Sequence, residues 1–244
     1  MIYYIYDGSF EGLLTSIYEA YYRKDNPLKI LSINNYQREL LVEYIHIETV
    51  PEKAEKVYNS IRKKISVKTL QNVFYVYLSE FDDIGTLIYQ YLRYGWKIGR
   101  NVDLHISDDR VSTIHNIRRK VTREIHFMLG LLRFKELKNN IYYAEYEPDY
   151  NITALIAPHF IERLSDQNWV IHDIKRGIGV LYNQKEWAVK DINLESDLEF
   201  SKDEIFYQRL WIKYFDSIAI KNRINPKLQK SNMPMKYWKY LVEK

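Results

Sequence analysis

The segment from Asp108 to Leu137 places apolar side chains at helical spacing, and no other feature of the sequence limits the fold as strongly. At about 100° per residue, one stripe along such a helix holds Ile114, Ile117, Val121, Ile125, Met128 and Leu132. One apolar stripe on an otherwise polar helix is typical of a helix that covers a core on one side. The pattern therefore predicts a long amphipathic helix over 108–137.

The opposite face of this helix is basic. It holds Arg119, Arg123, His126, Gly130 and Arg133. Guanidinium groups bind phosphate oxygens through paired hydrogen bonds, and a row of them can follow a nucleic-acid backbone. The alternative is a face of ordinary solvated charges. Glu124 lies towards the apolar side of the helix, where we expect it to be buried and paired.

Length and composition exclude several classes of protein. The 244 residues suffice for one large domain or two small ones, and the apolar fraction of 46% is ordinary for a globular protein. No apolar run reaches the roughly 18 residues of a transmembrane helix, and the first residues lack a signal-peptide pattern. The absence of cysteine excludes disulfides and thiolate chemistry. We therefore expect a cytoplasmic bacterial protein without a membrane partner.

The remaining apolar patterns predict an α+β fold of mixed helices with a small, mainly antiparallel sheet. Strands are expected over 2–6, 28–33, 40–50, 141–146, 169–174, 178–182 and 187–192. Helices are expected over 10–23, 51–65, 67–96, 108–137, 152–164, 203–222 and after Pro234. We expect a single compact unit, 1–244. It is mainly helical with N-terminal strands over 1–138, strand-rich over 139–200, and helical, basic and aromatic over 201–244.

The net charge of +4 hides two basic blocks. Residues 110–138 carry eight Lys/Arg against two acidic residues, and 201–244 carry ten against four. Two such blocks suggest a surface that binds a polyanion. We expect phosphate contacts from Arg119, Arg123, Arg133, Arg176, Arg223, Lys227 and Lys236. Tyr237 and Trp238 are expected to stack on bases, whereas the helical apolar spacing over 206–220 predicts packing into the core.

A second group of residues could form a catalytic site instead. The candidates are Glu124, His126, His159 and Asp173, with a histidine as base and a carboxylate to orient it. Each histidine could equally be structural, and strand alternation places His172 on the face opposite Asp173. The sequence has no paired-histidine zinc motif, phosphate loop or dinucleotide motif, so we expect no metal and no cofactor.

Four segments, in order along the chain, resemble a bacterial family assigned to DNA metabolism and DNA repair. They are 6–14 (YDGSFEGLL), 121–126 (VTREIH) with 130–134, 157–160 (APHF) with 169–176, and 225–229 (NPKLQ) with Met233-Pro234 and Tyr237-Trp238. The resemblance implies a DNA-related role. Members are typically encoded beside a radical S-adenosylmethionine (radical SAM) protein assigned to DNA repair or modification. Similar domains occur fused to a uracil-DNA-glycosylase-like domain.

Three hypotheses follow from these observations. The first is a DNA-binding component that acts with the radical SAM protein. The second is an enzyme that itself acts on DNA, by a glycosylase-like or hydrolytic reaction, through the His/Glu/Asp candidates. The third is a protein–protein adaptor whose aromatic C-terminal segment docks the radical SAM enzyme.

Overall fold

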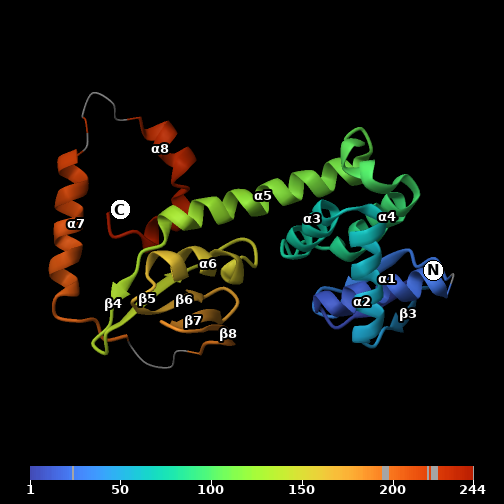
Figure 1. Ribbon diagram of the computed structural model, residues 1–244, viewed down its shortest axis with the longest axis horizontal. Helices are drawn as coiled ribbons and strands as arrows, with labels where there is room; N and C mark the ends of the chain where they lie inside the picture. The colour runs from blue at the N-terminus through green and yellow to red at the C-terminus, as the bar shows by residue number, and fades with distance from the viewer. Residues whose placement is uncertain (24, 194–197, 219, 221–224, 244) are drawn as a thin grey trace. The chain divides into compact units, whose positions relative to one another are not determined.

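The computed structural model describes residues 1–23, 25–193, 198–218, 220 and 225–243 (Figure 1). Its helices and two sheets confirm the α+β class. Contacts group the chain into two compact units, Met1–Thr122 and Arg123–Lys244. The boundary falls inside helix α5 (Asp109–Leu131), not at a linker, so composition along the chain carries no mark of it.

The first unit contains a three-stranded parallel sheet with the order β2-β1-β3. Its strands are β1 (Ile2–Tyr6), β2 (Lys29–Ser32) and β3 (Glu43–His46). Helix α1 (Phe10–Tyr22) connects β1 to β2, and a crossover of this kind returns the chain in the same direction. This sheet therefore differs from the antiparallel one expected. The alternating pattern over 40–50 yields only the short strand β3.

The start of α1 follows the sequence prediction. Ser9 is the N-cap, and its Oγ accepts a hydrogen bond from the Gly12 backbone N–H at 2.8 Å. Asp7 in turn accepts hydrogen bonds from the backbone and the hydroxyl of Ser9, at 2.8 and 2.6 Å. Glycine is required at position 12, because a Cβ there would overlap the Asp7 carboxylate.

Five further helical segments lie between β3 and α5. They are α2 (Pro51–Ser60), the π-helical turn η1 (Ile61–Ile65), α3 (Val67–Tyr77), α4 (Ile84–Ile98) and the 3-10 helix η2 (Gly99–Leu104). The single helix expected over 67–96 is therefore two helices. Glu80 and Asp83 have φ angles of 54° and 57° between them. Left-handed residues of this kind cannot continue a right-handed helix.

Helix α5 confirms the amphipathic pattern. Of its predicted stripe, Ile114, Ile117, Val121, Met128 and the following Leu132 are buried, and Ile125 is half-buried. Arg119, Arg123, His126 and Gly130 are exposed, as predicted, whereas Arg133 is half-buried. The helix ends at Leu131 rather than Leu137, because Lys135 and Glu136 form strand β4.

The second unit is built on a five-stranded sheet with the order β4-β5-β6-β7-β8. The strands are β4 (Lys135–Glu136), β5 (Ile141–Tyr146), β6 (Asn168–Asp173), β7 (Ile178–Asn183) and β8 (Trp187–Asp191). β5 and β6 pair in parallel because α6 (Thr153–Arg163) connects them, and the other pairs are antiparallel. The antiparallel pairs match the mainly antiparallel sheet predicted. Trp169, Ile171 and Val180 are fully buried in this sheet.

Among the residues that the structure describes after the sheet, three helical segments are present. They are α7 (Glu204–Ile218), α8 (Pro226–Asn232) and the 3-10 helix η4 (Met235–Tyr240). Asn225 caps α8 by accepting a hydrogen bond from the Leu228 N–H at 3.0 Å, and Pro226 is the first residue of the helix. The prediction that 206–220 packs into the core is wrong: Phe206 is 62% exposed, Tyr207 59% and Tyr214 53%. Helical spacing defines an apolar face but not what covers it.

Candidate functional site

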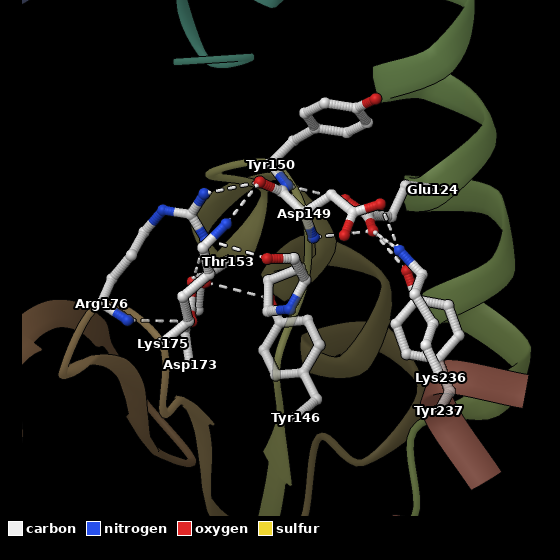
Figure 2. Close-up of polar contacts among 11 residues, drawn as sticks. Glu124, Tyr146, Asp149, Tyr150, Thr153, Asp173, Lys175, Arg176, Lys236 and Tyr237 are labelled. Carbon is white, nitrogen blue, oxygen red and sulfur yellow. Dashed lines mark hydrogen bonds and ion pairs between the residues drawn. The ribbon is translucent and has the colours of Figure 1, made fainter. Parts of the chain in front are cut away.

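Three distant parts of the sequence hold the loop that follows β5, residues 147–152 (Figure 2). Glu124 approaches from α5, Lys236 and Tyr237 approach from η4, and Arg176 approaches from the turn after β6. Three of the segments that carry the family resemblance therefore meet around one loop. Asp149 lies at the centre of this loop and is not among the predicted site residues.

Glu124 is the centre of this network. Its Oε1 accepts a hydrogen bond from the Asp149 backbone N–H, and its Oε2 accepts one from the Tyr150 N–H, both at 2.9 Å. Lys236 Nζ lies 3.1 Å from Oε1, and the Tyr237 hydroxyl donates to the same oxygen. Glu124 is 4% exposed, so these four hydrogen-bond donors take the place of the water molecules that would solvate the carboxylate. The expectation that Glu124 is buried and paired is confirmed.

The C-terminal 3-10 helix is attached to the loop by two lysines and a tyrosine. Lys236 Nζ forms ion pairs with both Glu124 and Asp149, and Lys239 Nζ forms one with Glu147 Oε2 at 2.8 Å. The hydrogen bond from Lys239 lowers the pKa of Glu147. Burial, followed by the hydrogen bond to Glu124, raises the pKa of Tyr237, so this phenol stays a protonated donor at neutral pH.

The other side of the loop is held from the end of β6. Arg176 donates to Asp173 Oδ2 at 2.8 Å, to the Asp149 carbonyl at 2.9 Å and to the Pro148 carbonyl at 3.3 Å. Lys175 Nζ donates to the same Asp149 carbonyl at 3.1 Å. Asp173 is fully buried, and burial raises its pKa, against the opposing effect of Arg176. Two cations therefore cover the carbonyls of a loop whose N–H groups face Glu124.

Tyr146, the last residue of β5, lies beneath the loop in Figure 2. Its hydroxyl shares a hydrogen bond of 2.9 Å with the Thr153 hydroxyl at the start of α6. Both residues are buried, and burial raises the pKa of Tyr146. The two hydroxyl groups therefore form a neutral, buried hydrogen bond beneath the loop.

This arrangement positions a loop, and it leaves neither carboxylate available as a base. Both oxygens of Glu124 accept hydrogen bonds, and Asp173 is paired with Arg176. His126 lies two residues after Glu124 and is exposed, whereas Glu124 is buried. His159 lies 5.0 Å from the Phe160 ring centroid, and none of the contacts described above includes it. The four catalytic candidates therefore do not form one cluster of contacts.

His172 has a separate structural setting. Its Nδ1 forms a hydrogen bond of 2.6 Å with the Tyr143 hydroxyl, and burial lowers its pKa. His172 and the neighbouring Asp173 are both buried, although strand alternation points them to opposite faces. Among the described residues, no group of three His, Asp or Glu side chains is placed to hold a metal ion.

The predicted phosphate contacts divide into two sets. Arg119, Arg123 and Lys227 are exposed. By contrast, Arg133 is ion-paired with Glu243 at 2.5 Å, and Arg176 and Lys236 belong to the loop network. Arg223 lies outside the described residues. Internal pairing therefore reduces the basic groups that can reach a phosphate.

The aromatic pair of η4 also differs from the prediction. Tyr237 is 2% exposed and donates to Glu124, so it cannot stack on a base. Trp238 is half-buried, and its Nε1 donates to the Met233 carbonyl at 2.8 Å. Alternation of aromatic and basic residues in a sequence does not tell which of the side chains point to the solvent and which point to the interior. Asp149 and Lys175 belong to the loop network but are not among the predicted site residues. No motif in the sequence marks either of them.

Comparison with known families gives one result that bears on this site. The family described as a domain of unknown function, DUF4130, matches residues 82–243. The chain belongs to this family. The DUF4130 range includes all of the loop network and three of the four segments that carry the resemblance, but not residues 6–14. No curated protein matches the chain.

The DUF4130 match says nothing of a reaction or a ligand, so function has to be argued from the geometry. Within the part of the chain that the structure describes, no helix combines the length and apolar character needed to cross a bilayer.

Proposed function

We propose that this protein is a DNA-binding component of a DNA repair or modification system that acts with a separate radical SAM protein. The observation that supports this most is the outward face of α5 between Arg118 and His126. The only acidic residue in that stretch is Glu124, and it is buried against the 147–152 loop. The outward face is therefore left with positive charges and no carboxylate.

The cations on this face are available. Arg119 donates to Asn116 Oδ1 at 3.1 Å, and the Arg123 guanidinium lies 5.2 Å from the Phe127 ring centroid. Neither forms an ion pair with a carboxylate of the described residues. They are four residues apart, so they occupy one face of the helix on successive turns. Lys120 is exposed beside them. Such a row suits the phosphates of a DNA strand.

The test is a pair of charge reversals, Arg119→Glu with Arg123→Glu, measured by fluorescence anisotropy with labelled single-stranded and duplex DNA. Each phosphate contact contributes about 0.9 to the slope of log affinity against log salt on duplex DNA. Loss of two contacts should therefore lower that slope by about 1.8 and weaken binding strongly at low salt. Lys185→Glu with Lys190→Glu is the matched control, since both lysines are exposed and belong to the β7–β8 hairpin and not to α5.

Two results would contradict the proposal. The first is that the wild-type protein binds neither form of DNA at low salt. The second is that the Lys185/Lys190 control loses as much affinity as the α5 variant, because the effect would then come from net charge and not from the α5 face.

The adaptor role is the second candidate, and the exposure of α7 favours it. A groove of about 980 Å³ lies between α7 and the β4–β5 edge. Its lining includes Tyr207, Leu210, Trp211 and Tyr214 from α7 and the acidic residues Glu136, Asp203 and Glu204. Arg133, the basic residue of the lining, is neutralised by Glu243. The groove therefore suits an apolar segment with basic residues, and we propose that the radical SAM protein supplies it.

Co-purification of the two proteins after nuclease treatment tests this role. Leu210→Asp with Tyr214→Asp should abolish co-purification, whereas Ile205→Asp, outside the groove lining, should not. Loss of the complex on nuclease treatment alone would refute direct docking. The enzymatic alternative has less support, because Glu124 and Asp173 are each occupied by their own partners.

A further inference from the structure

A second cavity lies in the first unit, at the ends of α1 and α2 and beside η1 and α4. Its volume is about 170 Å³. Four of its lining residues are aromatic and two are basic: Tyr18, Tyr21, Tyr22, Trp96, Lys56 and Lys64. Of this lining, the DUF4130 match covers Trp96 alone. The basic face of α5 contributes nothing to the cavity.

The aromatic residues form a continuous group of rings. Tyr18 and Tyr22 are stacked, with ring centroids 4.3 Å apart and an interplanar angle of 30°. Tyr21 contacts the Tyr22 ring edge-on at 5.6 Å and the Trp96 ring at 5.8 Å. Tyr21 and Tyr22 are 60% and 64% exposed, although aromatic rings of this size are usually buried. The group therefore offers open ring faces to a planar ligand.

The charge around the cavity is positive. Lys56 Nζ lies 5.7 Å from the Tyr18 ring centroid, and Lys64 is exposed on η1. Neither lysine forms an ion pair with a carboxylate of the described residues, and no lining residue is acidic. The buried Glu19 nearby is already paired with Lys53 and Arg23, both at 2.5 Å. Two lysines are therefore left for an anionic group.

One further observation points to a ligand here. Lys64 is carried by a π-helical turn, a rare conformation that occurs often at functional sites.

We infer that this cavity binds one nucleotide unit, with the base against the tyrosine and tryptophan rings and the phosphate on Lys56 and Lys64. Bases stack on aromatic side chains irrespective of sequence, because every base has a π-face. The cavity is smaller than the roughly 300–1,000 Å³ of sites for drug-sized ligands, which suits one ring system. A free nucleotide and a nucleotide within a strand share this chemistry.

Isothermal titration calorimetry on the full-length protein tests the inference with dAMP, deoxyadenosine and a short single-stranded oligodeoxyadenylate. Tyr21→Ala with Tyr22→Ala should weaken dAMP binding about tenfold or more. Lys56→Gln with Lys64→Gln should remove the preference for dAMP over deoxyadenosine. Tyr58→Ala and Lys63→Gln, exposed neighbours outside the lining, are the matched controls.

The source of the nucleotide follows from comparing the ligands. Tighter binding of the oligonucleotide than of dAMP, lost in the tyrosine variant, identifies a strand, and equal binding identifies a free nucleotide; both support the inference. The inference is overturned if neither dAMP nor the oligonucleotide binds at millimolar concentration. It is also overturned if the control variants weaken binding as much as the lining variants. Arg119→Glu with Arg123→Glu should leave dAMP binding unchanged, so failure of the α5 proposal and failure of this one are distinguishable.

Discussion

Replacement of Glu124 by glutamine tests the loop network most directly. The carboxylate accepts hydrogen bonds from two backbone N–H groups, both at 2.9 Å, and further ones from the Tyr237 hydroxyl and Lys236. Glutamine keeps the shape and one acceptor oxygen, but its NH2 group would face a backbone N–H. One buried donor then has no acceptor, and the remaining bonds lose the charge of their acceptor.

The expected destabilisation is about 2–4 kcal/mol. A hydrogen bond to a charged group contributes about 1.5–3 kcal/mol, and an unsatisfied buried donor costs about 1–3 kcal/mol. Removing one partner of a fully buried ion pair costs about 3–5 kcal/mol, but Lys236 keeps 41% of its side chain exposed and should contribute little. The two backbone amides and Tyr237 therefore account for most of the loss.

Urea unfolding measures the global change, and amide hydrogen exchange measures the local one. The Asp149 and Tyr150 amides should exchange faster in Glu124→Gln, because their acceptor is altered. Glu162→Gln on the exposed side of α6 is the control and should change stability by less than about 0.5 kcal/mol. If Glu124→Gln unfolds at the wild-type urea concentration and both amides stay protected, Glu124 does not hold the loop.

Two other predictions concern single positions. Burial lowers the pKa of His172, so the unfolded chain takes up its proton more readily; stability from this group is complete above about pH 6.5 and is lost as the pH falls below it. His172→Gln should therefore flatten the decline in urea midpoint between about pH 7 and 5, and an unchanged slope would rule this out. Gly12→Ala should lower the thermal midpoint, since its Cβ would lie 2.8 Å from Thr49 Oγ1 and overlap Asp7. Gly130→Ala, which meets open space, should raise the midpoint slightly, and equal effects at the two glycines would contradict the argument.

Sequence reasoning succeeded wherever the determining interactions are local. The stripe of α5, the start of α1 at Phe10 and the strands of the second sheet follow from periodicity and from hydrogen bonds within a few residues. It failed where a long-range contact decides the outcome. Nothing near Arg133 in the sequence indicates that Glu243 will pair with it, and nothing near Tyr237 indicates that Glu124 will bury it.

The sequence by itself determined the basic, acid-poor outward face of α5, because the helical period alone separates Arg119 and Arg123 from the apolar stripe. Only the tertiary structure decided that Glu124 points inward to a loop 25 residues away in the sequence. The same holds for Arg176 and Lys236, which form ion pairs with Asp173 and Glu124. The tertiary structure also decided that α7 stays exposed and that Tyr21 and Tyr22 line a cavity with Trp96. The physical reason is the same in each case: helical spacing specifies which side chains share a face, whereas burial and ion pairing depend on what the rest of the chain brings to that face.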